Sequence, residues 1–381
     1  MNIPFIYDRY VTSKDFSGRK SECLALSNLI EADENVLMYE PPKSGKNSVI
    51  QQTFLVMRLG GKVLNAAILD LFNIKTPEKL CARFGSTVIR SVASSPDEYG
   101  RMISEYLSGT HCSFDMERFS ESDEIVSLSS APDLNDIEAI FSLPYRIARD
   151  SGIKLVVVMN EFQSILSMEN HDMILKAMES VFKTNGKGSG CSFIISGSKV
   201  NAMKYIFCRQ KYFHRMIEHL PLQQINETEL TEHIRKGFLK GGKEIDKELA
   251  IGACRLFKGN IWYINHFFAI CDSMSKGYIN EGIMMDALNA LISIHEPRFM
   301  NMIDSLTEHQ IRFLRAIIDG ITRFSSTEVI AKYSLNSSAN VKRVKDALMK
   351  KEIVTFNEND DPVILDPLFE YWIRKHYFEL S

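Results

Sequence analysis

The sequence lacks the cysteine patterns that mark zinc sites and disulfide frameworks. Its seven cysteines are an odd number, they are scattered, and they form neither a C-x-x-C pair nor a cluster with histidine. This arrangement excludes the common structural zinc motifs and a secreted disulfide scaffold. We therefore predict free thiols in a reducing compartment.

The sequence also lacks long apolar runs and a charge excess of either sign. Its longest strongly apolar core, residues 155–159, is far shorter than the roughly 20 residues that a membrane helix needs. The first nine residues have no basic region followed by an apolar one, so we expect a cytoplasmic protein without a secretory signal or a membrane partner. A net charge of −3 gives no general attraction to nucleic acid.

What is present predicts a layered α/β domain, because short apolar segments alternate with helical stretches. Four nearly continuous apolar segments are typical of buried parallel strands: residues 36–39, 63–72, 154–159 and 192–195. Ligands of such a sheet gather at the carboxyl ends of its strands. We expect residues 1–220 to form this domain, with the Ser/Asp/Glu-rich stretch 120–136 as an exposed loop.

The remaining residues predict two helical parts. Strand signals fade after Pro221, and helical periodicity predicts a lid over residues 221–304. Residues 305–381 have three short helices followed by a β-prone pair, the order of a winged helix. The third of these helices carries five basic residues: Lys342, Arg343, Lys345, Lys350 and Lys351. They suit DNA or a solvated surface, while the acidic turn at 357–361 favours a protein contact or a spacer role.

The segment from Glu40 to Asn47 predicts a degraded phosphate-binding loop between a strand and a helix. In the pattern G-x-x-x-x-G-K-[ST], backbone N–H groups cradle phosphates, the lysine reaches them and the hydroxyl binds Mg²⁺. Gly45 and Lys46 match this pattern, whereas Glu40 replaces the first glycine and Asn47 replaces the hydroxyl. A plain surface turn is the alternative interpretation. The predicted nucleotide-binding residues of the loop are Pro42, Lys43, Ser44, Gly45, Lys46, Asn47 and Ser48.

Polar residues at the ends of two further strands predict a weakened catalytic site. Asn160 and Glu161 follow an apolar strand, where an active ATPase has Asp-Glu to hold the metal and polarise the attacking water. Glu161 is therefore a candidate base, and Asn160 and Asn47 are weakened metal ligands. The next strand ends in hydroxyls, and Ser196 or Ser198 is a candidate sensor of the γ-phosphate, with ordinary turn chemistry as the alternative.

Several motifs together resemble one known family. Residues 16–22 are similar to its F-x-G-R-x-x-E box, residues 39–46 to its Y-[GA]-P-R-R-x-G-K-[ST] loop, and residues 160–163 to its D-E-F-Q motif. Segments 70–72, 196–198 and 366–369 add to the similarity. The chain thus resembles the prokaryotic AAA+/STAND-like P-loop ATPases called archaeal-type ATPases, which include Bacteroides-like members.

The resemblance implies that ATP or ADP, with weakly held Mg²⁺, binds between the α/β core and the lid. Gly18 and Arg19 would flank the base. Family members act as nucleotide-driven switches or as modules that recognise a partner protein. The departures at Glu40, Asn47 and Asn160 predict slow or absent hydrolysis. A nucleotide-independent interaction scaffold and a DNA-binding regulator that acts through the winged helix are the alternatives.

Overall fold

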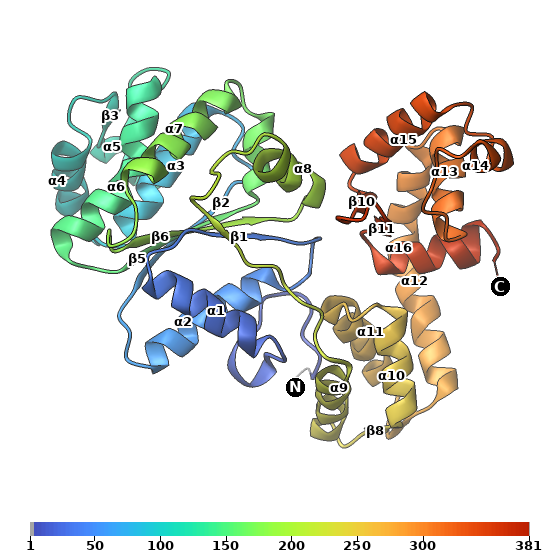
Figure 1. Ribbon diagram of the computed structural model, residues 1–381. Helices are drawn as coiled ribbons and strands as arrows, with labels where there is room; N and C mark the ends of the chain where they lie inside the picture. Colours follow the sequence, from blue (N-terminus) through green and yellow to red (C-terminus); the bar gives the residue numbers. More distant parts are fainter. Residues whose placement is uncertain (1–3, 381) are drawn as a thin grey trace. The chain divides into compact units, whose positions relative to one another are not determined.

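The computed structural model describes residues 4–380, and the chain divides into two units (Figure 1). We call residues 20–42 and 49–222 the sheet unit. Residues 1–19, 43–48 and 223–381 form the other unit, which we call the lid–wing unit.

Five parallel strands in the order β2-β5-β6-β1-β7 form the centre of the sheet unit. They are β1 (Val36–Tyr39), β2 (Asn65–Asp70), β5 (Leu155–Asn160), β6 (Cys191–Gly197) and β7 (Glu218–His219). All seven residues of β6 are buried, as expected for a parallel strand that is covered on both faces. Figure 1 shows α1 (Lys20–Glu31) and α2 (Lys46–Leu59) on one face of the sheet. It shows α3 (Pro77–Arg90), α6 (Leu134–Ser151) and α7 (His171–Thr184) on the other. The predicted parallel α/β sheet is confirmed.

Helix α6, which covers the sheet, begins and ends at residues with clear capping chemistry. Asp133 caps α6 in a reciprocal capping box with Asp136, and Gly152 ends that helix in the left-handed conformation. The helices and short strands of this unit are α1 (Lys20–Glu31), α2 (Lys46–Leu59), α3 (Pro77–Arg90), α4 (Pro96–Tyr106), β3 (Cys112–Ser113), α5 (Met116–Ser122), β4 (Ser127–Leu128), α6 (Leu134–Ser151), η2 (Phe162–Ser167), α7 (His171–Thr184), α8 (Val200–Lys204) and η3 (Tyr205–Arg209).

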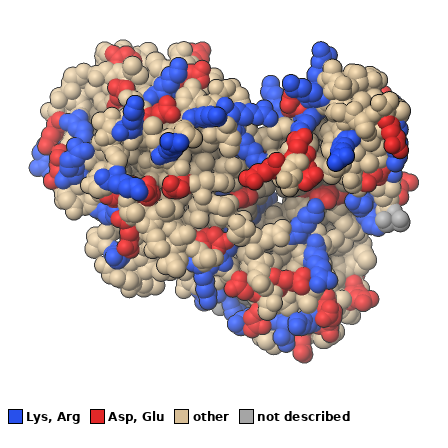
Figure 2. All heavy atoms as spheres, viewed as in Figure 1, with Lys and Arg blue, Asp and Glu red and all other residues tan. Residues whose placement is uncertain are grey.

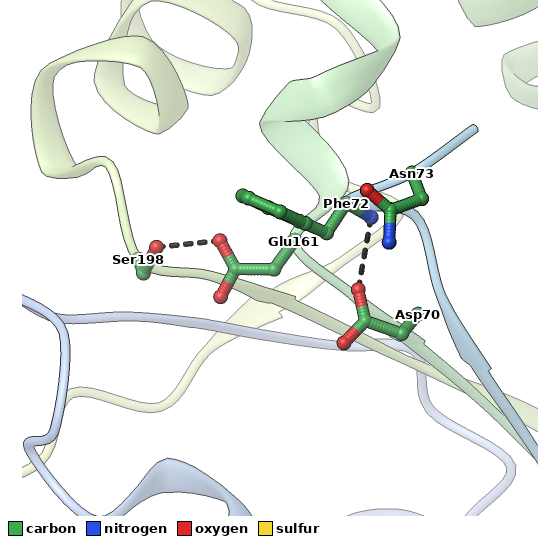
Figure 3. A pocket seen from close by; sticks show the side chains of 5 residues that line it. All are labelled: Asp70, Phe72, Asn73, Glu161 and Ser198. Carbon is green, nitrogen blue, oxygen red and sulfur yellow. Dashed lines mark hydrogen bonds between the residues drawn. The ribbon is translucent and has the colours of Figure 1, made fainter. Parts of the chain in front are cut away.

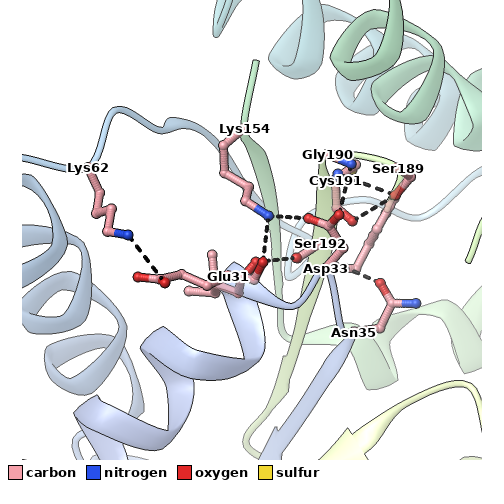
Figure 4. A network of polar contacts seen from close by, with 11 residues as sticks. Glu31, Asp33, Asn35, Lys62, Lys154, Ser189, Gly190, Cys191 and Ser192 are labelled. Atoms are coloured by element: carbon pink, nitrogen blue, oxygen red, sulfur yellow. Dashed lines mark hydrogen bonds and ion pairs between the residues drawn. The ribbon is translucent and has the colours of Figure 1, made fainter. Parts of the chain in front are cut away.

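A polar network ties together the amino ends of the central strands (Figure 4). Asp33, which precedes β1, forms an ion pair with Lys154 and accepts a hydrogen bond from the backbone N–H of Gly190 at 3.1 Å. Asn35 accepts a hydrogen bond from the Phe193 N–H at 3.0 Å. The polar side chains at the amino ends of the strands therefore have a structural role. The carboxyl ends of the strands are where ligands of a parallel sheet bind.

The prediction of an exposed loop over residues 120–136 is wrong in part. The segment contains the end of α5, the strand β4 and the start of α6. Ile125 and Val126 are fully buried, and their backbone N–H groups donate to Ser86 Oγ on α3 at 3.1 and 2.9 Å. The few apolar residues of this polar stretch show neither a helical nor an alternating period.

The lid–wing unit contains the predicted helices, followed by a small antiparallel hairpin. Its elements after residue 222 are α9 (Glu227–Lys240), β8 (Glu244–Ile245), α10 (Lys247–Leu256), α11 (Ile261–Met274), β9 (Tyr278–Ile279), α12 (Glu281–Asp304), α13 (Glu308–Ile318), α14 (Thr327–Lys332), α15 (Ser338–Lys350), β10 (Val354–Phe356), β11 (Pro362–Ile364), α16 (Pro367–Trp372) and η4 (Ile373–Tyr377). A short η1 (Ser13–Asp15) precedes them. No helix within residues 4–380 is long and apolar enough to cross a membrane.

Helix α12 continues past Pro297 to Asp304. A proline inside a helix removes one backbone hydrogen bond and is normally disfavoured. Here the buried side chains of His295, Phe299 and Ile303 keep the helix packed on both sides of the proline. The helix therefore stays continuous up to Asp304.

Candidate functional site

The loop between β1 and α2 has the backbone features of a phosphate-binding loop. Residues 40–45 connect the end of β1 to Lys46, the first residue of α2, whose free N–H groups favour anions. Gly45 has φ +92°, and a Cβ there would also lie 3.3 Å from Arg19 Nη1. Lys46 is only 7% exposed, and its Nζ lies 3.3 Å from Ser44 Oγ. The loop is therefore preformed around its glycine and its lysine.

The Gly18-Arg19 box contacts this loop directly. Arg19 Nη1 donates a hydrogen bond to the Ser44 carbonyl oxygen at 2.7 Å. Gly18 has φ +70°, and a Cβ at this position would lie 2.5 Å from Ile225 Cγ2. The structure thus brings together two groups of predicted binding residues that are 25 positions apart in sequence.

The other predicted loop residues lie in different surroundings. Pro42 and Asn47 are exposed. Ser48 Oγ accepts a hydrogen bond from the Val11 N–H at 3.1 Å, so its hydroxyl oxygen already has a partner. Glu40 Oε1 accepts one from the Leu222 N–H at 3.3 Å in the segment after β7. This contact holds one oxygen of the carboxylate, which is the group that would repel a polyphosphate.

Lys43 of the same loop lies on the indole ring of Trp262 in α11. Its Nζ is 3.4 Å from the ring centroid, a cation–π contact. The Trp262 Nε1–H donates to the Tyr7 carbonyl oxygen at 2.6 Å. In the next position of α11, the Tyr263 hydroxyl bonds to Asp366, the N-cap of α16, at 2.9 Å. The loop is thereby connected through the lid to the winged-helix region by consecutive side chains.

Beside Trp262, His295 is nine-tenths buried and has a pKa lowered to about 4 by burial and then by the charge of Arg298. An unfolded histidine titrates near pH 6.5. Between these two values the unfolded chain binds a proton that the folded chain does not. We therefore expect the lid–wing unit to lose stability as the pH falls from about 6.5 towards 4, with a slope of at most one proton from this residue.

Urea denaturation at several pH values tests this expectation. Tryptophan fluorescence reports on the lid–wing unit, because Trp262 and Trp372 are the only two tryptophans and both belong to it. His295→Gln should flatten the pH dependence. An equal slope in the variant and the wild type would contradict the assignment.

A pocket of about 490 Å³ lies at the carboxyl edge of the sheet (Figure 3). Asp70, Phe72, Asn73, Glu161 and Ser198 line it. Glu161 has φ +54°, and its Oε2 accepts hydrogen bonds from Ser198 Oγ at 2.5 Å and from Gln163 Nε2 at 2.6 Å. Of the two candidate sensors, Ser196 is 2% exposed within β6. The hydroxyl that contacts Glu161 thus belongs to Ser198.

Asp70 also lines this pocket, and it belongs to segment 70–72 of the family resemblance without being a predicted site residue. It ends β2 and pairs in register with Asn160, which ends β5. It lies within the predicted strand 63–72, and the structure ends that strand at Asp70. Its neighbourhood with Asn160 was not visible in the sequence, because the order of strands in the sheet is a tertiary property.

A second acidic group, His111 with Asp133 and Asp136, has a structural explanation. Their ligand atoms lie within 4.8 Å of one another. Asp136 accepts hydrogen bonds from the backbone and the ring of His111 at 2.8 and 2.9 Å, and it completes the capping box of α6. The group fixes the start of a helix.

The basic helix α15 uses part of its charge within its own domain. Lys345 forms an ion pair with Asp360 in the β10–β11 turn, and Lys351 Nζ donates to the Ser305 carbonyl oxygen at 3.1 Å. Lys342, Arg343 and Lys350 are exposed. Figure 2 shows Lys and Arg side chains over α15 with Asp and Glu beside them, so this face is mixed in sign.

Comparisons with known proteins agree with this architecture. Residues 297–375 match the family model of a probable winged helix domain. The chain is similar to a Walker-type ATPase of Pyrococcus abyssi, with a TM-score of 0.67 and 14% identity over 97% of this chain and 99% of that one. This chain has the fold of a Walker-type ATPase.

The same fold is seen in the ORC2 protein of Aeropyrum pernix in its ADPNP–ADP complexes, with a TM-score of 0.54 and 15% identity over 95% of this chain and 93% of that one. Its ADP form gives a TM-score of 0.55 at 15% identity, over 96% and 95% of the two chains. No curated protein matches the sequence. The predicted P-loop fold and the C-terminal winged helix are confirmed.

Proposed function

We propose that this protein binds ATP or ADP through residues 42–48 and acts as a nucleotide-dependent switch with slow or absent hydrolysis. The observation that carries the proposal is the preformed loop, in which Gly45 is left-handed, Lys46 begins α2 and Arg19 bonds to Ser44. The ORC2 protein of the same fold was solved with ADP and ADPNP. Membership of the STAND-like archaeal-type ATPases is part of this proposal.

The residues of the sheet unit support impaired hydrolysis. Asn160 supplies a neutral amide where the family motif has an aspartate, and its buried Oδ1 accepts no hydrogen bond from residues 4–380. An oxygen without a donor in this position fits a Mg²⁺ ligand. Glu161 remains as the candidate base. Magnesium would supply charge neutralisation at the phosphates, and Asn160 adds no negative charge to hold the ion.

The switch proposal rests on the contact between Lys43 and Trp262. A polyphosphate at the loop offers Lys43 a stronger partner than an indole ring, because charge-assisted bonds exceed cation–π contacts. Occupancy of the loop would then change the lid side chains that reach Asp366. The proposal includes a protein partner that recognises this change and a location in the cytoplasm. The free state of all seven cysteines is consistent with that location.

Isothermal titration calorimetry with ATP and with ADP, each with Mg²⁺ and with EDTA, tests nucleotide binding directly. Binding in the micromolar range supports the proposal. Absence of binding up to millimolar nucleotide, where an interaction is worth only about 4 kcal/mol, removes it. The nucleotide-independent scaffold would then be the remaining interpretation.

Restoring the missing hydroxyl should strengthen the metal-dependent part of binding. We expect Asn47→Thr to increase ATP affinity in Mg²⁺ by about 1 kcal/mol, roughly fivefold, and to leave affinity in EDTA unchanged. Asn47 is exposed at the start of α2, so the change costs little stability. Asn47→Ala is the matched control and should show no gain. An equal gain in EDTA would show that the hydroxyl acts without the metal.

A further inference from the structure

Two carboxylates line one pocket at the carboxyl edge of the sheet. Asp70 and Glu161 both line this pocket, and no lysine or arginine among the described residues lines it (Figure 3). Asp70 Oδ1 accepts a hydrogen bond from the Phe72 N–H at 2.9 Å, and Glu161 Oε2 accepts two. Each carboxylate keeps its second oxygen for another partner.

Buried amide oxygens next to these carboxylates also lack donors. Asn160 Oδ1 is buried and has no hydrogen-bond partner within residues 4–380. Gln163 is 6% exposed, its amide nitrogen donates to Glu161, and its Oε1 likewise has no donor there. That oxygen lies beside Gly197, the residue before Ser198. Buried acceptors without donors are costly, and a hard cation satisfies oxygens of this kind.

The register of the sheet places the carboxylate of Asp70 next to the neutral amide of Asn160. Asp70 is the register partner of Asn160, and neighbouring strands lie about 4.8 Å apart. Two residues paired in a parallel sheet point to the same face. A carboxylate at the end of β2 can therefore serve the position that an aspartate at the end of β5 would serve.

We infer that Asp70 is the metal-holding carboxylate of this protein, with Asn160 and Glu161 as its neighbours. The site takes a divalent cation of the Mg²⁺ or Mn²⁺ class, because carboxylate, amide and hydroxyl oxygens are the ligands that these ions prefer. The inference deepens the proposed function and rests on it for the biological use of the metal. The binding of the metal itself does not depend on the proposed function.

Binding of Mn²⁺ alone to the full chain, measured by electron paramagnetic resonance of the free ion, tests the inference. Asp70→Asn should weaken Mn²⁺ binding about tenfold or more, because the variant loses a charged ligand. The asparagine retains the Oδ1 that accepts the Phe72 N–H, so the fold is preserved. Asp97→Asn removes an equal charge from an exposed site in the first turn of α4 and should change nothing.

A second substitution makes the test specific to the paired strand ends. The double variant Asp70→Asn, Asn160→Asp returns the charge to the register partner and should restore Mn²⁺ binding to within about threefold of wild type. Equal binding in wild type and Asp70→Asn overturns the inference, as does absence of Mn²⁺ binding by the wild type at millimolar ion. Failure of the double variant to recover also overturns it.

The failure of this inference can be told apart from failure of the proposed function. ATP titrated in EDTA reports on the loop alone, and Asp70→Asn should bind it as the wild type does. Loss of ATP binding by the wild type, together with Asp70-dependent Mn²⁺ binding, would remove the proposed function and keep the metal site. ATP binding by the wild type, together with Mn²⁺ binding that does not depend on Asp70, would remove only the metal site.

Discussion

Lys46→Ala weakens the binding of ATP by roughly 30-fold or more, the largest effect that we expect on nucleotide affinity. Lys46 is 7% exposed and begins α2, so its ammonium group is held in place before the nucleotide arrives. Truncating one partner of a buried charge pair costs about 2–5 kcal/mol, and each 1.4 kcal/mol is tenfold in affinity. Calorimetry of wild type and variant under identical salt measures the ratio.

Lys62→Ala is the matched control for this variant. Lys62 follows the carboxyl end of the same helix, is exposed and pairs with Glu31 at 3.4 Å. Its removal takes away the same charge at little cost in stability, because exposed ion pairs contribute at most about 1 kcal/mol. Equal affinities for ATP in wild type and Lys46→Ala would show that the loop does not hold the phosphates. The nucleotide-dependent switch would then be excluded.

The secondary structure that surrounds this lysine could be predicted because its signals are local. Segment 36–39 and β1 have the same bounds, and β5 and the following polar pair lie within one residue of the prediction. Continuous apolar runs predict buried strands whatever their neighbours are. The phosphate-binding loop could be predicted equally well, because the φ of +92° at position 45 favours glycine, and this requirement is local. The winged helix followed from element order alone.

The chemistry around the loop depends on contacts between distant residues and could not be predicted in the same way. Lys43 was expected to face phosphate, and nothing in its neighbourhood indicates the indole of Trp262, 219 positions away. Asp70 is a candidate metal ligand only because it pairs in register with Asn160. The strand β7 has two residues, both exposed, so it has neither the length nor the pattern of a predicted strand.

The most distant of these contacts attaches the N-terminal segment to the lid. Phe5 is fully buried, and its ring packs 4.9 Å from that of Phe238 and 5.8 Å from that of Phe268. It lies over Gly237 of α9, where an added Cβ would be 2.5 Å from Phe5 Cε1. The absence of a side chain at Gly237 therefore makes room for this ring.

Phe5→Ala should lower the unfolding free energy of the lid–wing unit by about 3–5 kcal/mol, the usual cost of removing a buried phenylalanine. Gly237→Ala should cost about 1–3 kcal/mol, because its methyl group overlaps the ring of Phe5. Urea denaturation followed by tryptophan fluorescence measures both values in this unit. Tyr10→Ala, at a residue that is 57% exposed, is the control and should change stability little.

The double variant separates packing of this pair from other causes. Once Phe5 is alanine, the methyl group of Gly237→Ala meets open space, so its cost should largely disappear and the two effects should not add. Additive effects would mean that Gly237 is needed for its backbone and not for the ring above it. A small loss in Phe5→Ala itself, below about 1 kcal/mol, would show that residues 4–19 do not stabilise the lid.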